Sequence, residues 1–252
     1  MRGKLYYGFA ASLLLACQVY GVSSTVLLKG GTVITFDPES SSVVVHRDSS
    51  ILVKDDRIVS IGDKIDSEEI SEAEVVDVEG KILTPGFVDA HHHLWQTAYR
   101  TTVSNTTLMQ YTVRNSEYSP ITYNFTAEDV YVGQLAGIYE SLNAGVTSIL
   151  DHAHHTWSEE TSLAGLRASV DSGARVFWSY AIRDVGDRFP IPNQIEDFAK
   201  LAKDSDGIWA KSPVTVGLAY DMFWTVGPSQ AEDILRLARY CPKKENNWYK
   251  VG

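Results

Sequence analysis

The chain has 252 residues, of which 44% are hydrophobic and 21% are charged, and its formal net charge is −10 at pH 7. These values are ordinary for a folded protein, and the length suits one large domain or two smaller ones. The acidic balance argues against nucleic acid and anionic membrane surfaces as partners, and it leaves a small-molecule substrate open.

Residues 1–21 have the layout of a secretory signal peptide. Two basic residues precede a mostly apolar run at residues 5–17, and small residues follow it, so cleavage is predicted near Gly21. An uncleaved anchor is the alternative, but the run is shorter than the ~20 residues that span a bilayer. We therefore expect a secreted protein that is free of the membrane after cleavage. Glycosylation triplets at Asn105 and Asn124 agree with export.

Residues 22–84 predict a small β-sandwich segment. The stretches TVLLKGGTVITFD, SSILVKDDRIVSIGDKI and AEVVDVEGKILTPG are rich in β-branched residues and are interrupted by turn residues. Asp55-Asp56 and Glu79-Gly80 suit tight turns between strands. Because no helical period fits this region, short strands are the expected structure throughout.

From Pro85 onward, strands and helices are predicted to alternate. The strands are FVDAHHH, VTSILDH, ARVFWSYAI and VTVGLAY; the helices are TAEDVYVGQLAGIYESLNAG, SEETSLAGLRASVDSG, residues 195–204 and GPSQAEDILRLARY. The polar stretch up to Asn124, before the first helix, is expected to be a long loop with some helix. Such alternation indicates parallel strands covered by helices, and the apolar strands are expected to be buried on both faces.

The predicted fold class is therefore α/β: a partial (β/α)8 TIM-type barrel of about four βα units over residues 85–240, preceded by the β-sandwich segment. A complete barrel needs ~250 residues, whereas residues 85–252 number 168. The final stretch, residues 241–252, is a polar tail without a strand pattern. We therefore expect a chain that stops after about the fourth βα unit.

Three consecutive histidines end the first strand of the barrel region. Because side chains alternate along a strand, Asp89, His91 and His93 are expected to share one face, with His92 on the other. Two imidazoles one residue apart form half of a transition-metal site, since catalytic zinc usually has three protein ligands and one open position. A run of surface histidines is the alternative, but the apolar strand before the cluster favours a site at a strand end.

The stretch PGFVDAHHH resembles the first-strand signature of the amidohydrolase superfamily, Pro-Gly-apolar-apolar-Asp-x-His-x-His. Other stretches agree in the same order, namely VLLKGGTVIT, DDRIVSIGD, ESLNAGVTSILDH and VTVGLAY followed by SQAEDILRLAR. The similarity covers about residues 25–240. It is strongest to the branch that contains cytosine deaminase, guanine deaminase and atrazine chlorohydrolase.

This resemblance implies a metal-dependent hydrolase of amidohydrolase or deaminase type that acts on carbon–nitrogen bonds other than peptide bonds. It implies a small-molecule substrate and one divalent metal, with zinc favoured and iron as the alternative. His91 and His93 match the first two metal ligands of the family, and Asp89 matches the acid that supports them. A metal of this kind activates water for attack near neutral pH.

The chain also departs from the family pattern. Members supply further ligands from the fifth, sixth and eighth strands, and a Glu near the fifth strand; no residue after Tyr240 matches these. We therefore assign no catalytic residue and expect the chain to be incomplete and inactive alone. A non-catalytic truncated fragment or binding protein derived from an amidohydrolase is the alternative, and completion by a homo-oligomer is left open.

Polar residues after the other predicted strands are candidates for substrate binding. Asp151 and His152 follow the second strand, and Tyr220 follows the fourth. For each of them, a polar loop without contact to substrate is the alternative. The same rim also carries His154, His155, Arg183, Asp184 and Asp221.

Overall fold

The computed structural model describes residues 25–65, 70–116, 119–203, 207–223 and 227–239. The predicted signal peptide and the polar tail lie outside these residues. Among the described residues, no helix combines the length and the hydropathy needed to cross a membrane. The chain divides into two compact units, Met1–Pro85 and Gly86–Gly252, and each is described by itself.

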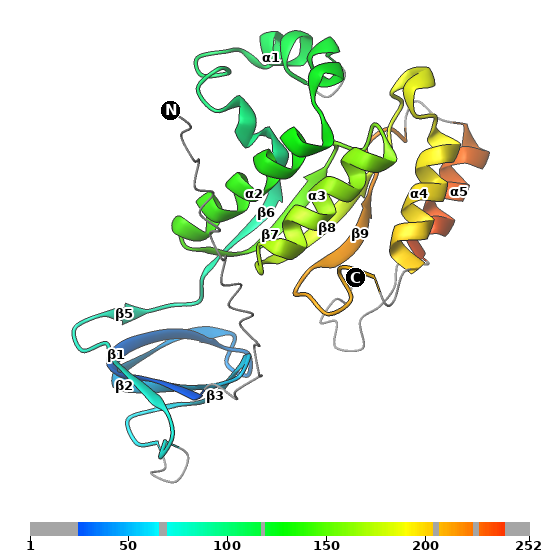
Figure 1. Ribbon diagram of the computed structural model, residues 1–252. Helices are drawn as coiled ribbons and strands as arrows, with labels where there is room; N and C mark the ends of the chain where they lie inside the picture. The colour runs from blue at the N-terminus through cyan, green and yellow to red at the C-terminus, as the bar shows by residue number, and fades with distance from the viewer. Residues whose placement is uncertain (1–24, 66–69, 117–118, 204–206, 224–226, 240–252) are drawn as a thin grey trace, which may run out of the picture. The chain divides into compact units, whose positions relative to one another are not determined.

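One sheet of five strands makes up the N-terminal unit (Figure 1). The long strands β1 (Thr25–Asp37) and β2 (Ser42–Lys54) pair antiparallel, and β3 (Arg57–Gly62) continues the sheet beyond β2. The short strands β4 (Glu74–Asp77) and β5 (Ile82–Leu83) both pair parallel with β1. The predicted strands are found, but they form a single sheet; the second sheet of a sandwich is not among the described residues.

A four-stranded parallel sheet is the centre of the second unit. Its strands are β6 (Phe87–His92), β7 (Val146–Ala153), β8 (Arg175–Ala181) and β9 (Thr215–Ala219), hydrogen-bonded in chain order. Each crossover carries helical structure, which confirms the predicted α/β class.

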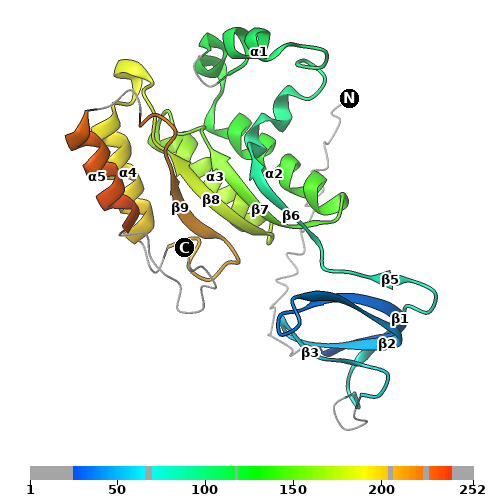
Figure 2. The ribbon, with the colours of Figure 1, turned by 180° about the vertical axis from the view of Figure 1, so that it is seen from behind.

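Four helices accompany this sheet: α2 (Ala127–Asn143), α3 (Glu159–Asp171), α4 (Ile191–Lys203) and α5 (Pro228–Arg239). Figure 1 shows α2 and α3 along one face of the sheet and α4 beside α5, and Figure 2 shows the opposite face in front of them. Helix α2 begins at the predicted capping box of Thr126. Helix α4 begins at Ile191, four residues earlier than predicted. Its second residue, Pro192, is tolerated because backbone N–H groups in the first turn of a helix have no partner within the helix.

The connection between β6 and α2 is long and partly helical, as expected. It contains the 3-10 helix η1 (Leu94–Tyr99), the short helix α1 (Leu108–Arg114) and the 3-10 helix η2 (Pro120–Asn124). The Thr107 side chain caps α1 through a capping box with Gln110. This connection starts immediately after the three histidines, so its packing affects where they lie.

Burial alternates along the inner strands. The residues that pack with the helices in the main core are Ile149, Val176, Trp178, Tyr180 and Val216. On the other face, Leu150 is exposed and Phe177 is half-buried. The expectation that both faces would be buried is therefore wrong for the described part of the sheet, since helices cover only one of them.

Strand β6 is an outer strand, and its side chains are largely exposed. Among the described strands it pairs only with β7, and the ladder between them is irregular after Asp89. Phe87 and Val88 are 69% and 72% exposed. The position of the histidines therefore depends on contacts other than a regular hydrogen-bond ladder.

Two glycines of α2 let η1 approach closely. A Cβ atom added at Gly137 would lie 2.6 Å from the Leu94 carbonyl oxygen and 2.6 Å from Thr97 Oγ1. A Cβ atom at Gly133 would collide with the Trp95 carbonyl oxygen. The start of η1 thus lies directly on the α2 backbone, a separation that only glycine permits.

We predict that Gly137→Ala destabilises the protein by about 1–3 kcal/mol, because the added methyl group overpacks against backbone. Helix propensity alone favours alanine over glycine by ~1 kcal/mol, so a loss of stability would reveal the close approach. The control is Ala136→Gly on the exposed face of α2, where propensity alone predicts a loss of ~1 kcal/mol. Urea denaturation measures both; a stabilising Gly137→Ala would contradict the packing described.

A buried carboxylate links α4 to the sheet. The Tyr180 hydroxyl donates to Asp197 Oδ2 at 3.0 Å, and Asp197 is only 4% exposed. Burial raises the pKa of Asp197 to about 6, although hydrogen bonds from Tyr180 and Ser162 oppose the rise. Between the ordinary carboxyl pKa and this value, the folded protein binds more protons than the unfolded chain.

It follows that Asp197 stabilises the fold at low pH, and that this contribution is lost as pH rises through about 6. We expect the free energy of unfolding of the wild type, relative to Asp197→Asn, to fall by about 1–3 kcal/mol between pH 4 and pH 7. Denaturation of both proteins at the two pH values measures the difference. Equal pH dependence in the two proteins would show that Asp197 does not titrate in this range.

Candidate metal centre

Three histidines and one aspartate of the second unit gather at the carboxyl ends of its strands. Parallel strands end at the same edge of a sheet, which is where ligands bind in α/β folds. His91 and His93 lie at the end of β6, and His152 lies at the end of β7. Asp221 follows β9 and reaches the same edge, because its carboxylate contacts His152.

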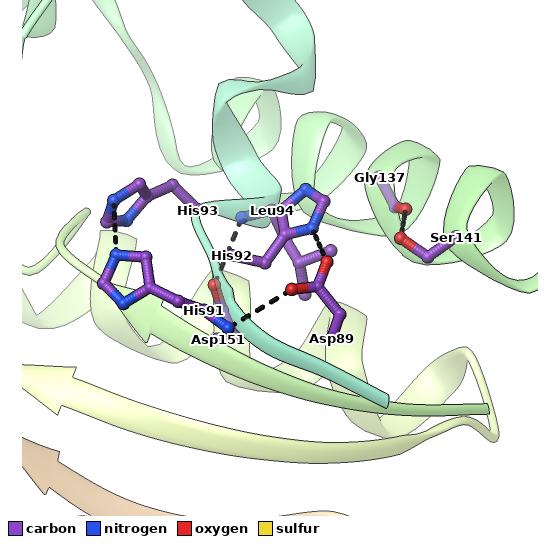
Figure 3. A network of polar contacts seen from close by, with 8 residues as sticks. All are labelled: Asp89, His91, His92, His93, Leu94, Gly137, Ser141 and Asp151. Carbon is purple, nitrogen blue, oxygen red and sulfur yellow. Dashed lines mark hydrogen bonds and ion pairs between the residues drawn. The ribbon is translucent and has the colours of Figure 1, made fainter. Parts of the chain in front are cut away.

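His91 and His93 converge, as expected from strand alternation (Figure 3). Their Nε2 atoms are 3.2 Å apart and their rings meet edge-on, at 88°. Two nitrogen ligands ~2.05 Å from a tetrahedral zinc ion lie ~3.3 Å from each other. The pair therefore has the spacing of two ligands of one metal ion; that it binds a metal stays a prediction.

The His93 ring is held in one tautomer. Its Nδ1–H donates to the His152 carbonyl oxygen at 3.0 Å, which leaves the lone pair on Nε2. Burial lowers the pKa of His93 to about 4, so the ring is neutral at neutral pH. A neutral ring with Nε2 available is the form that coordinates a metal.

Asp89 contacts the two neighbouring histidines rather than the site interior. Its Oδ2 atom lies 2.6 Å from His92 Nδ1, and its Oδ1 atom accepts from the His91 backbone N–H at 3.2 Å. Partial burial raises the pKa of Asp89, but these hydrogen bonds outweigh it and lower the pKa below its ordinary value. Strict alternation predicted opposite faces for Asp89 and His92; the irregular end of the β6 ladder brings them together.

His152 lies beside the histidine pair and is almost fully buried. Its ring centroid is 5.4 Å from that of His91 and 5.2 Å from that of His93. Its Nε2 atom lies 2.7 Å from Asp221 Oδ2, across the intervening strand β8. This position next to the pair is consistent with the predicted contact to substrate, which stays a prediction.

His93, His152 and His154 also form a group whose candidate ligand atoms all lie within 4.8 Å of one another. His154 Nδ1, however, accepts a hydrogen bond from the Trp95 indole N–H at 3.0 Å. Burial, above all, lowers the pKa of His154 far below its ordinary value. The neutral ring therefore carries its proton on Nε2, so it would have to break the Trp95 bond or lose this proton to coordinate a metal.

Other residues of the predicted rim have different surroundings. His155 is buried against α3, where its ring fills the space beside Gly165 and its Nδ1 contacts the Thr161 carbonyl oxygen at 3.0 Å. The Arg183 guanidinium is buried 5.9 Å from the centroid of the Trp157 ring.

Tyr220 lines a polar cleft of about 520 Å³ next to the ends of β8 and β9. Asp184 and Asp187 line the same cleft, and the Tyr220 hydroxyl donates to the Met222 carbonyl oxygen at 3.4 Å. The predicted substrate role of Tyr220 is compatible with this position and stays a prediction.

Asp151 lies on the helix side of the sheet, with no exposed surface. Its Oδ2 atom accepts from Gln134 Nε2 at 2.6 Å and its Oδ1 atom accepts from the Leu94 backbone N–H at 3.1 Å. Gln134 was not predicted from the sequence as part of the site. The feature that could have indicated it is a long polar side chain between Val130 and Ile138 on the buried face of α2.

The donor set fits a transition metal. Imidazole nitrogen is a preferred ligand of zinc and iron, and the described residues supply two nitrogen atoms at the right spacing. They thereby account for about half of a four-coordinate site.

The chain is similar in sequence to proteins that are named as deaminases. A 5'-deoxyadenosine deaminase from Methanobrevibacter smithii is 31% identical over 189 residues, which are 75% of this chain and 41% of that protein. A 5-methylthioadenosine/S-adenosylhomocysteine deaminase from Symbiobacterium thermophilum is 32% identical over 126 residues, 50% of this chain and 28% of that protein. The chain thus spans less than half the length of these relatives.

Solved structures share the fold at low sequence identity. Guanine deaminase from C. acetobutylicum with bound guanine has a TM-score of 0.70 and 16% identity, over 86% of this chain and 51% of that one. An atrazine chlorohydrolase from Arthrobacter aurescens TC1, solved with zinc, has a TM-score of 0.67 and 20% identity, over 85% and 50%. The profile of the Amidohydrolase family matches residues 82–244, about two thirds of the chain. The chain therefore belongs to the amidohydrolase family.

Proposed function

We propose that this chain carries the metal-binding part of a hydrolase that acts on carbon–nitrogen bonds other than peptide bonds, of the deaminase type. The observation that carries the proposal is the convergence of His91 and His93 at the carboxyl edge of a parallel sheet. Membership in the amidohydrolase family and relatives named as deaminases support it. A small molecule is the proposed substrate.

The proposal extends to the architecture. The strand order β6-β7-β8-β9 is that of four successive units of a (β/α)8 barrel. Neighbours of which the chain covers about half support this interpretation. We propose one divalent metal, with zinc preferred over iron, and export through the predicted signal peptide.

Each residue of the centre has a defined role in this proposal. His91 and His93 would hold the metal through their Nε2 atoms, and the His152 carbonyl oxygen orients the His93 ring. A bound divalent metal supplies the Lewis acidity that makes water a nucleophile near neutral pH. The His152 ring lies beside the pair, and the Asp221 carboxylate lies 2.7 Å from its Nε2 atom.

The relatives indicate which substrates to test first. Two of the relatives are named as deaminases of 5'-deoxyadenosine and of 5-methylthioadenosine/S-adenosylhomocysteine, compounds in which a purine ring carries an amino group. We propose an amino-substituted purine or a related aromatic nitrogen ring as the substrate class. The cleft beside Tyr220 provides polar groups for the rest of such a molecule.

We predict that His91→Ala and His93→Ala each lower the affinity for zinc at least ten-fold, because each removes one of two converging ligands. Competition with a chromophoric chelator measures the affinity. His46→Ala, in strand β2 of the other unit, is the matched control and should leave the affinity unchanged. Equal affinity in all four proteins would place the zinc elsewhere.

Hydrolysis is tested by ammonia release from the zinc-loaded protein, with 5'-deoxyadenosine, guanine and an amino-substituted triazine as substrates. Activity that His93→Ala abolishes, and that His46→Ala retains, would support the proposal, because only the first variant removes a ligand. Stoichiometric zinc without ammonia release from any of these substrates would agree with a chain that holds the metal but is inactive alone. Ammonia release that His93→Ala retains would contradict the proposed role of the pair.

A further inference from the structure

The three histidines end a strand whose last residues are not held by a regular ladder. The pairing of β6 with β7 shifts register between Asp89 and His92. Side-chain hydrogen bonds hold this segment at its irregular end. One of them is the bond from the His93 ring to the His152 carbonyl oxygen, and another is the bond from the Leu94 backbone N–H to Asp151.

The bond to Asp151 belongs to a fully buried network. Asp151, Gln134, Ser169 and Leu94 each have 0% exposure. Gln134 Nε2 lies 2.6 Å from Asp151 Oδ2 and 3.1 Å from Ser169 Oγ. The network therefore connects α3, α2, β7 and the residue that directly follows His93.

Helix α2 also packs directly against the backbone at Leu94, which follows the three histidines. Gly137 leaves no room for a side chain between α2 and the Leu94 carbonyl oxygen. Figure 3 shows Asp151 reaching Leu94 beside the turn of α2 that carries Gly137. The Leu94 backbone is thus held at its N–H by Asp151, and its carbonyl oxygen lies against the α2 backbone.

We propose that Asp151 is a positioning residue, which sets the spacing of His91 and His93 through Leu94 and does not itself contact substrate. The inference rests on the proposed metal role of the pair. It replaces the substrate contact predicted for Asp151, since both carboxylate oxygens accept buried hydrogen bonds and the side chain has no exposed surface.

A carboxylate is required here because two donors converge on it. Leu94 N–H approaches one oxygen and Gln134 Nε2 approaches the other. In Asp151→Asn, the side-chain amide has one acceptor oxygen and one NH2 group, so one of the two donors would face another donor. A buried donor that loses its partner costs ~1–3 kcal/mol, and the less constrained of the two groups, the Leu94 segment, is expected to move.

The experiment compares Asp151→Asn with Asp197→Asn in the purified protein. Asp197 is the matched control, because it is also a buried carboxylate of this unit that accepts a hydrogen bond, from Tyr180. Amide hydrogen exchange of residues 91–95, resolved by mass spectrometry, reports on the position of the segment without any metal. Zinc affinity from chelator competition reports on the pair itself.

We expect Asp151→Asn to speed exchange of residues 91–95 and to weaken zinc binding about ten-fold or more, as outer-shell substitutions typically do. Asp197→Asn should change neither quantity. Unchanged exchange and affinity in Asp151→Asn, or equal changes in both variants, would overturn the proposal. If the wild type binds zinc, faster exchange in Asp151→Asn with unchanged zinc affinity would overturn it as well.

The two proposals fail in different ways. If the wild type binds no zinc, the proposed function fails, whereas faster exchange limited to Asp151→Asn would still support positioning by Asp151. If His91→Ala and His93→Ala abolish zinc binding and Asp151→Asn has no effect, the metal site stands and the positioning role is overturned. If Asp151→Asn fails to fold, Gln134→Leu takes its place in the experiment. This variant removes one of the two donors to Asp151, so it should weaken zinc binding, but by less than the loss of the carboxylate would.

Discussion

The described arrangement depends on one buried carboxylate and on the two donors that compensate its burial. Removing Asp151 from water is costly, and the Gln134 side chain and the Leu94 backbone N–H offset this cost only if helix α2 and the start of η1 are in place. Burial still raises the pKa of Asp151 to about 6, so the compensation is partial. The sheet, helix α2 and the histidine segment therefore depend on one another. If α2 or the segment moved away, the Asp151 carboxylate would be buried without its hydrogen-bond donors.

This dependence explains why an outer strand can carry a precise site. The exposed side chains of β6 contribute little hydrophobic stabilisation, and its pairing with β7 is irregular where precision is needed. The segment is held instead by hydrogen bonds that His93 and Leu94 donate to residues of the better packed strand β7. The β7 end thus supplies a carboxylate on the helix side and, through the next residue, a backbone carbonyl group on the site side.

The sequence predicted what depends on local periodicity. Alternation along β6 places His91 and His93 together, and strand–helix alternation predicts the parallel sheet. The sequence could not predict that Asp89 contacts His92. The register shift between β6 and β7 that brings them together does not change the alternation of residue types along β6. The sequence also missed the bond of Gln134 to Asp151, since a polar residue on a buried helix face reveals its partner only when helix and sheet are packed.

The free edge of β6 has a consequence for the assembly of the centre. Among the described strands only β7 pairs with β6, so the backbone groups on its other side are available to a further strand, which would lie ~4.8 Å away. A parallel strand added there would end beside His91 and His93. If that strand carried one further ligand, metal binding would be thermodynamically linked to pairing at this edge of the sheet.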